Sequence, residues 1–268
     1  MNPSSNTKLQ RTFYVLATIG TALTLVILAT SLLLRLATEA TLDGHTQSVL
    51  PPALEEACRL MHRLTASGVG LLALILLLMC LRKTSHAPGT RKASAWVFVT
   101  TVGLAVIGPL TPGYRIEAIT VLNVGLGSML LMALWRLREI SGLETQRTQP
   151  LKRIAQLTLI GLVLHIASGG LAAANSQWLP NLGLTVWLHV ATAVGLMVLI
   201  ALLMRHMRAS TGALKIKALR YLMVGQILLG GLLLVLNLRP IWLNFSHGMV
   251  SAILAMLLLT LMHRQYVP

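Results

Sequence analysis

The chain has 268 residues, of which 55% are hydrophobic and only 11% are charged. A soluble domain carries about 25% charged residues, so lipid must solvate most of this chain. The net charge of +15 does not indicate nucleic-acid binding, because 17 of the 22 Lys and Arg fall at the N-terminus, in or next to alternate loops or at the C-terminus. That distribution is typical of the cytoplasmic segments of a membrane protein.

The apolar runs predict eight transmembrane helices. Lipid admits only helices and closed barrels, and these Leu-rich runs lack the period-2 alternation of a barrel strand. Each run is near the length of about 20 residues that crosses a bilayer. The first is too long for a signal-peptide core, so we expect it to be retained. In chain order the helices are expected at 13–35, 59–82, 93–111, 117–136, 154–175, 183–205, 218–238 and 243–263.

The loops predict the orientation of these helices. Basic side chains mark the connections 82–92, 136–153 and 205–217, whereas the connection 36–58 is acidic and contains Glu55 and Glu56. Lys and Arg are enriched in cytoplasmic loops. We therefore expect both termini in the cytoplasm and the chain in the cell inner (plasma) membrane, with the lipid bilayer around it.

An internal repeat divides the chain. His62 and His189 open the same pattern, H-x-x-T-A-x-G, and His165-Ile-x-x-Gly-Gly matches Gln226-Ile-x-x-Gly-Gly. Four crossings return a chain to its starting side, so the halves are expected in the same orientation. The predicted fold is an all-α membrane protein of two pseudo-symmetric four-helix bundles, 1–136 and 154–268, joined by a cytoplasmic linker at 137–153.

Each even-numbered helix has one candidate ligand near its outer end: His62, Asn123, His189 and His247. Polar side chains at this depth usually face the bundle interior. Two histidines at matching depth on neighbouring helices can bind a haem iron from both sides. His189 and His247 meet this requirement. The alternative is that each histidine makes a single interhelical hydrogen bond.

Residues near the four candidate ligands have either a structural or a haem-binding interpretation. The paired glycines suit either helix packing or the wall of a flat macrocycle. His165 lies on an odd-numbered helix, where we favour a polar contact over iron ligation. Arg63 is either an interfacial anchor or a bidentate contact to a haem propionate. Zinc is disfavoured, because the level of the histidines offers no third or fourth ligand.

At these residues the chain resembles the haem A synthase family, which has eight helices in two four-helix halves. The resemblance covers about 13–263. It depends on the order and depth of four short pieces, namely His62-Arg63, Trp187-Leu188-His189, Gln226-Ile-Leu-Leu-Gly230-Gly231 and Phe245-Ser246-His247-Gly248.

The resemblance implies an oxidoreductase that converts the C8 methyl group of haem O to the formyl group of haem A. It implies that His189 and His247 bind the iron of a haem b cofactor. It also implies that His62, with Asn123 opposite, faces the substrate haem O. Haem O synthase and terminal oxidase assembly are the partners implied, a homo-oligomer is compatible with the family, and the electron donor is not identified by the sequence.

Three departures from the family pattern concern the first half. The helix 4 position is Asn123 rather than histidine, Arg59 stands where the family has a glutamate, and no cysteine pair occurs in an outer loop. Glu55 and Glu56 are the remaining candidates for an acidic catalytic group near His62. These departures keep a second hypothesis open, a non-catalytic bis-histidine membrane cytochrome or haem-carrying oxidase assembly subunit. A transporter is a third, although the halves are parallel and no helix is clearly broken.

Overall fold

The computed structural model describes residues 3–42, 50–82, 89–110, 117–142, 152–175, 183–207, 213–236 and 241–264. Within these ranges the chain forms eight α-helices and one short 3-10 turn, and no strand. The helices are α1 (Pro3–Leu42), α2 (Pro52–Leu81), α3 (Thr90–Ile107), α4 (Glu117–Ser141), α5 (Lys152–Asn175), α6 (Leu184–Met207), α7 (Ala213–Val235) and α8 (Ile241–Arg264), and the 3-10 turn is Gly108–Leu110.

The fold class is confirmed as an all-α membrane protein. Seven helices are long and apolar enough to cross a bilayer over their described residues. The other, α5, is apolar over Gln156–Ala172. The whole of α5 has 24 residues, which gives a length of about 36 Å at 1.5 Å per residue and exceeds the hydrocarbon core of a bilayer.

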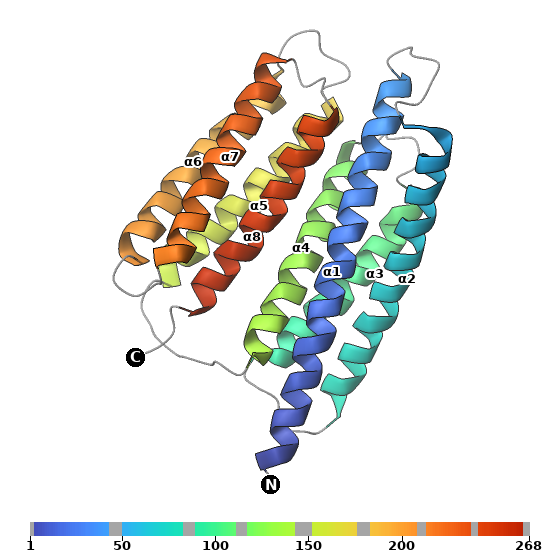
Figure 1. Ribbon diagram of the computed structural model, residues 1–268, viewed down its shortest axis with the longest axis vertical. Helices are drawn as coiled ribbons and strands as arrows, with labels where there is room; N and C mark the ends of the chain where they lie inside the picture. The colour runs from blue at the N-terminus through green and yellow to red at the C-terminus, as the bar shows by residue number, and fades with distance from the viewer. Residues whose placement is uncertain are drawn as a thin grey trace.

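The helices run up and down along one direction, and Figure 1 shows that α1 begins and α8 ends at the same end of the bundle. We name this the basic end, because Arg82, Arg138 and Arg205 lie where α2, α4 and α6 approach it. The opposite end, where α6 and α8 begin, is named the histidine end. Helices α1–α4 and α5–α8 form two neighbouring groups.

Several helices are longer than predicted, and their ends lie at other residues. Pro52 starts α2 seven residues earlier than expected, because proline suits the first turn of a helix and Leu-Glu-Glu-Ala continues it. Glu55 and Glu56 therefore lie on α2 rather than in a loop. Helix α4 extends to Ser141, into the predicted linker, and 143–151 of that linker lies outside the described residues.

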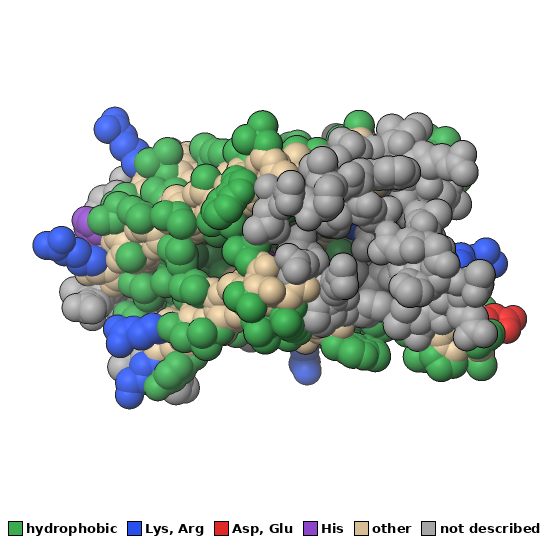
Figure 2. All heavy atoms as spheres, turned by 90° about the horizontal axis from the view of Figure 1, so that it is seen from above, with side chains coloured by type: hydrophobic (Ala, Val, Ile, Leu, Met, Phe, Trp, Pro, Cys, Tyr) green, Lys and Arg blue, Asp and Glu red, His purple; other side chains and the backbone are tan. Residues whose placement is uncertain are grey.

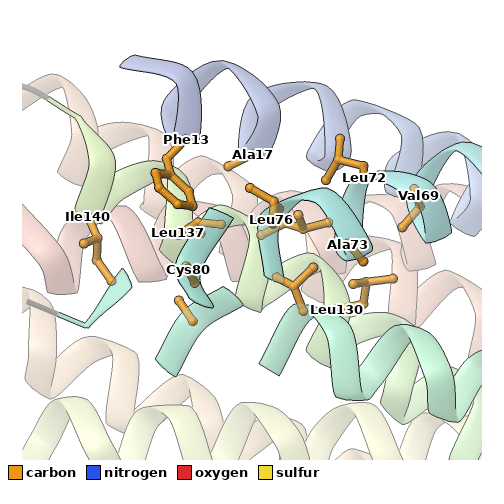
Figure 3. Packing of buried hydrophobic residues seen from close by; sticks show 13 residues of the cluster. Phe13, Ala17, Val69, Leu72, Ala73, Leu76, Cys80, Leu130, Leu137 and Ile140 are labelled. Atoms are coloured by element: carbon orange, nitrogen blue, oxygen red, sulfur yellow. The ribbon is translucent and has the colours of Figure 1, made fainter. Parts of the chain in front are cut away.

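The first four helices share one hydrophobic cluster toward the basic end. Figure 3 shows Phe13 and Ala17 of α1 packed over Leu76 of α2. Leu130, Leu134 and Leu137 of α4 belong to the same cluster, together with Ala93 and Val97 of α3. Buried hydroxyl groups in these helices form hydrogen bonds within their own helix. Thr21 and Thr24 donate to the carbonyl groups of Ala17 and Gly20, one turn back.

The last four helices have a matching cluster, again toward the basic end. It contains Leu162 of α5, Ile200 and Leu203 of α6, Leu219 of α7 and Leu258 of α8. Their backbones, however, pack as two pairs, α5 with α6 and α7 with α8. The apolar cluster joins the two pairs through side chains at the basic end.

Helices α4 and α1 join the two groups, since α4 packs on both α5 and α8 and α1 packs on α8. The indole Nε1 of Trp135 on α4 donates a hydrogen bond of 2.8 Å to Thr260 on α8. Gly248 lets α8 approach α1, because a Cβ at this position would lie 2.8 Å from Leu32. Hydrophobic side chains cover most of the coloured surface in Figure 2, and Lys and Arg project from its margins.

Candidate functional site

His189 and His247 face each other at the histidine end of the second group of helices. His189 lies in the second turn of α6 and His247 in the second turn of α8. Their ring centroids are 6.1 Å apart, with the ring planes at 76°. Both side chains are half-buried. The histidines that the sequence pairs across two helices thus meet in one place.

A third imidazole joins them from α5. The ring of His165 is buried and stacks on His189, with the centroids 4.3 Å apart and the planes 13° from parallel. His165 Nδ1 lies 3.5 Å from the hydroxyl of Thr192. The polar contact expected for His165 is present, and the sequence did not reveal its stacking on His189.

Each of the two facing histidines has a polar partner on the preceding helix. Nδ1 of His189 lies 3.2 Å from the hydroxyl of Ser168 on α5. Nε2 of His247 lies 3.1 Å from the side-chain amide of Gln226 on α7, and that amide also donates to Ser251. The partners limit the rotation of both rings, as second-shell groups do for metal-binding histidines.

The first glycine of each glycine pair makes room for a histidine ring. A Cβ at Gly169 would lie 2.9 Å from Cε1 of His189, and a Cβ at Gly230 would lie 3.3 Å from Cε1 of His247. The second glycines differ from them. Gly170 faces α4, and nothing lies within 4 Å of a Cβ placed at Gly231. The glycine pairs therefore serve close approach of the imidazoles as well as helix packing.

The first group of helices has a simpler arrangement. His62 of α2 is half-buried, and its Nδ1 lies 3.3 Å from the hydroxyl of Thr30 on α1. Asn123 is half-buried in the second turn of α4. A polar residue on an odd-numbered helix thus contacts His62, as Ser168 contacts His189 and Gln226 contacts His247.

The acidic and basic candidates of α2 lie toward its exposed side. Glu55 accepts two hydrogen bonds from Arg59, of 2.6 and 3.1 Å. Glu56 and Arg63 are exposed. The carboxylate of Glu55 is thus paired with the arginine that stands in the family's glutamate position. The catalytic roles of Glu55 and Glu56 and the propionate-binding role of Arg63 stay predictions.

The two facing imidazoles fit a shared iron. Two rings that bind one metal, each through a bond of about 2 Å, have centroids roughly 6 Å apart, close to the 6.1 Å between His189 and His247. Nδ1 of His247 is buried without a hydrogen-bond partner among the described residues, which is unusual for a buried polar atom. Neutral imidazole is also a usual haem ligand. The same ranges contain no group of three or more His, Cys, Asp and Glu side chains placed to bind a metal.

Sequence reasoning missed Ser168, Thr30 and Ser251. A usable signal existed for Thr192, because the repeat places a threonine three residues after both His62 and His189. Thr65 and Thr192 donate to the carbonyl groups of these two histidines, at 3.1 and 2.8 Å. Ser168 lies between His165 and Gly169, within the repeated segment that begins at His165. The packing of α5 on α6, and not the sequence, shows that its side chain faces His189.

The fold and the paired imidazoles define the class: a multi-pass α-helical membrane protein with a site suited to haem. No protein-family model matches the chain. It is similar to the heme A synthase of Shewanella oneidensis, with 25% identity over 81% of this chain and 80% of the relative. This similarity supports a divergent member of the haem A synthase family, as the sequence motifs predict.

Proposed function

We propose that this protein acts in haem A biosynthesis, as a membrane oxidoreductase that converts the C8 methyl group of haem O to the formyl group of haem A. The similarity to a heme A synthase supports the pathway. The observation that carries the proposal is the separation of 6.1 Å between the rings of His189 and His247. Two imidazoles this close, one from each of two helices, could together hold one iron, which would supply the redox chemistry.

In this proposal, His189 and His247 bind a haem b. A haem bound there supplies a one-electron carrier to the reaction. Gly169 and Gly230 let each ring lie close against the neighbouring helix, and Ser168 and Gln226 restrict the rotation of the rings. The leucines at the basic end close that side of the four helices to water.

The first group of helices would bind the substrate. His62, oriented by Thr30, would face the porphyrin of haem O together with Asn123. Arg63 would contact a propionate and Glu55 or Glu56 would supply a carboxylate at the exposed end of α2. The orientation proposed from the basic loops puts this end of the bundle on the outer side of the cell inner membrane and both termini in the cytoplasm. Haem O synthase and the assembly of a terminal oxidase are the proposed partners.

The experiment is pigment extraction from cells that make haem O and lack a haem A synthase. Expression of this chain should produce haem A, and expression of the His62→Ala variant should not. Haem O alone, from cells in which the wild-type protein is present in the membrane, would reject the enzymatic part of the proposal.

A second candidate is a non-catalytic bis-histidine cytochrome or haem-carrying assembly subunit. The ion pair of 2.6 Å between Glu55 and Arg59 favours it, because it neutralises one of the two acidic candidates near His62. This candidate predicts a purified protein with one haem b in cells that accumulate only haem O. The enzyme predicts the same haem b and also haem A.

A further inference from the structure

Three side chains around His189 form a closed network that no motif of the sequence identifies. The hydroxyl of Ser168 lies 3.2 Å from His189 Nδ1 and 2.8 Å from the hydroxyl of Thr192. Thr192 in turn lies 3.5 Å from Nδ1 of His165, and His165 stacks on His189. Residues of α5 and α6 thus surround His189 on one face and at one nitrogen.

The hydroxyl protons of this network are already used. Thr192 donates its proton to the carbonyl group of His189, at 2.8 Å. Ser168 donates its proton to the carbonyl group of His165 at 2.9 Å or to the oxygen of Thr192 at 2.8 Å. A hydroxyl has one proton to give. When each hydroxyl gives its one proton to these oxygen acceptors, Nδ1 of His189 is the donor to Ser168.

This accounting fixes which nitrogen of His189 is free. A neutral imidazole has one N–H and one lone pair, and the bond made by one nitrogen decides the state of the other. With the proton on Nδ1, the Nε2 atom of His189 carries the lone pair that a metal needs. His165 reaches the same tautomer if its Nδ1 donates to Thr192.

His247 lacks this arrangement, since its Nε2 rather than its Nδ1 is beside the partner, the amide of Gln226. The amide nitrogen of Gln226, which lies beside Nε2 of His247, can only donate. Because a rotation of the amide would exchange this nitrogen for the acceptor oxygen, Gln226 does not select a tautomer by itself. The hydroxyl of Ser251, one turn after His247, bonds Gln226 and the carbonyl group of His247, not the imidazole. The two facing histidines are therefore positioned by different chemistry.

We propose that Ser168, Thr192 and His165 form a positioning unit that holds His189 as the Nδ1-protonated imidazole, with Nε2 presented as a ligand to iron. The proposal deepens the haem-binding function proposed above and rests on it. Ser168 supplies the acceptor, Thr192 keeps the proton of Ser168 away from the ring, and the stacked ring of His165 prevents His189 from tilting.

The test is Ser168→Ala in the full-length protein, purified in detergent and titrated with haem b. Loss of a second-shell partner typically costs about 10-fold to 100-fold in metal affinity. We expect a loss in that range for Ser168→Ala, with a shifted reduction potential and altered low-spin electron paramagnetic resonance signals of the haem that remains. Ser168→Thr keeps the hydroxyl and should restore all three properties to the wild-type values. Ser128→Ala is the matched control and should leave haem affinity unchanged, because the hydroxyl of Ser128 donates to the carbonyl group of Val124 on α4.

The outcomes separate the two proposals. If His189→Ala and His165→Ala both keep their haem, the haem-binding function itself is wrong. If His189→Ala loses haem while Ser168→Ala binds with wild-type affinity and potential, only the positioning unit is wrong. Equal losses in Ser168→Ala and Ser168→Thr would also overturn it, because they would show that volume rather than the hydroxyl matters. A haem lost in His165→Ala and kept in His189→Ala would make His165 the ligand instead.

Discussion

The two groups of helices share a plan and differ in the number of imidazoles at the histidine end. Both have a leucine-rich cluster toward the basic end and an even-numbered helix whose histidine touches a polar residue of the preceding helix. In the second group three imidazoles converge, whereas in the first His62 has the hydroxyl of Thr30 as its partner. Under the proposed function, the group with three imidazoles binds the cofactor and the group with His62 binds the substrate.

The largest effect should come from removing one of the facing imidazoles. His189→Ala or His247→Ala should lower the haem affinity of the second group more than about tenfold, because iron loses one of two protein ligands. Absorbance of the purified protein in the Soret region measures it. His206→Ala is the control, since this ring is exposed near the end of α6 and its Nδ1 lies 2.8 Å from the carbonyl group of Leu202. Full haem content in both alanine variants would remove the distinction between the halves.

The glycines provide a smaller and graded effect on the second group. Gly169→Ala places a Cβ 2.9 Å from the ring of His189, so the ring or the helix must move. We expect haem affinity to fall about tenfold, the lower bound for disturbed ligand orientation. Gly230→Ala, with 3.3 Å to His247, should have a weaker effect. Gly231→Ala meets nothing within 4 Å and should bind haem like the wild type. The reverse order among the three titrations would contradict the packing described for the rings.

The contact between α4 and α8, which joins the two groups of helices, can be weakened without changing a residue of either histidine site. Thr260→Val removes the acceptor for the indole of Trp135, a bond of 2.8 Å between α4 and α8. Interhelical hydrogen bonds of membrane proteins contribute about 0.6 kcal/mol on average. Unfolding in mixed micelles should show a loss of that size, while the haem spectrum stays the same. A changed spectrum would mean that the halves are coupled through this contact.

The smallest effect on stability is expected at the exposed end of α2. Glu55→Gln removes an ion pair to Arg59 of the i,i+4 type, which contributes about 0.3–0.5 kcal/mol on a helix surface. Arg59→Gln should cost the same amount, because it removes the same pair. A haem A yield that falls in Glu55→Gln and not in Arg59→Gln would assign a catalytic role to the carboxylate. Equal yields in both would leave the ion pair as a feature of the surface alone.

The sequence predicts most of the fold because lipid leaves the backbone few choices. Uninterrupted apolar runs identify the helices, and the basic loops between some of them mark where one helix ends and the next begins. The ends of the helices were harder to place, as at Pro52, because a helix can continue into water without apolar residues to mark it. The boundary between membrane and loop is therefore not the boundary of the helix.

The site is only partly visible in the sequence. Spacing and depth identify His189 and His247, since two histidines in matching turns of neighbouring helices are rare in an apolar chain. The stacking of His165 and the bond of Ser168 depend on how α5 is rotated about its axis against α6. The sequence spacing of His165, Ser168 and Gly169 shows that they share a face of α5, but not which helix that face contacts. For Glu55 and Glu56 the sequence predicts a catalytic carboxylate. In the structure Glu55 is paired with Arg59 and Glu56 is exposed, so that role stays a prediction.

The most direct test of the account is the type and amount of haem in the purified wild-type protein. We expect one tightly bound haem b per chain in protein from cells that make no haem O, with the low-spin spectrum of two imidazole ligands. A protein that contains no b-type haem after reconstitution, or a haem with a single imidazole ligand, would contradict it.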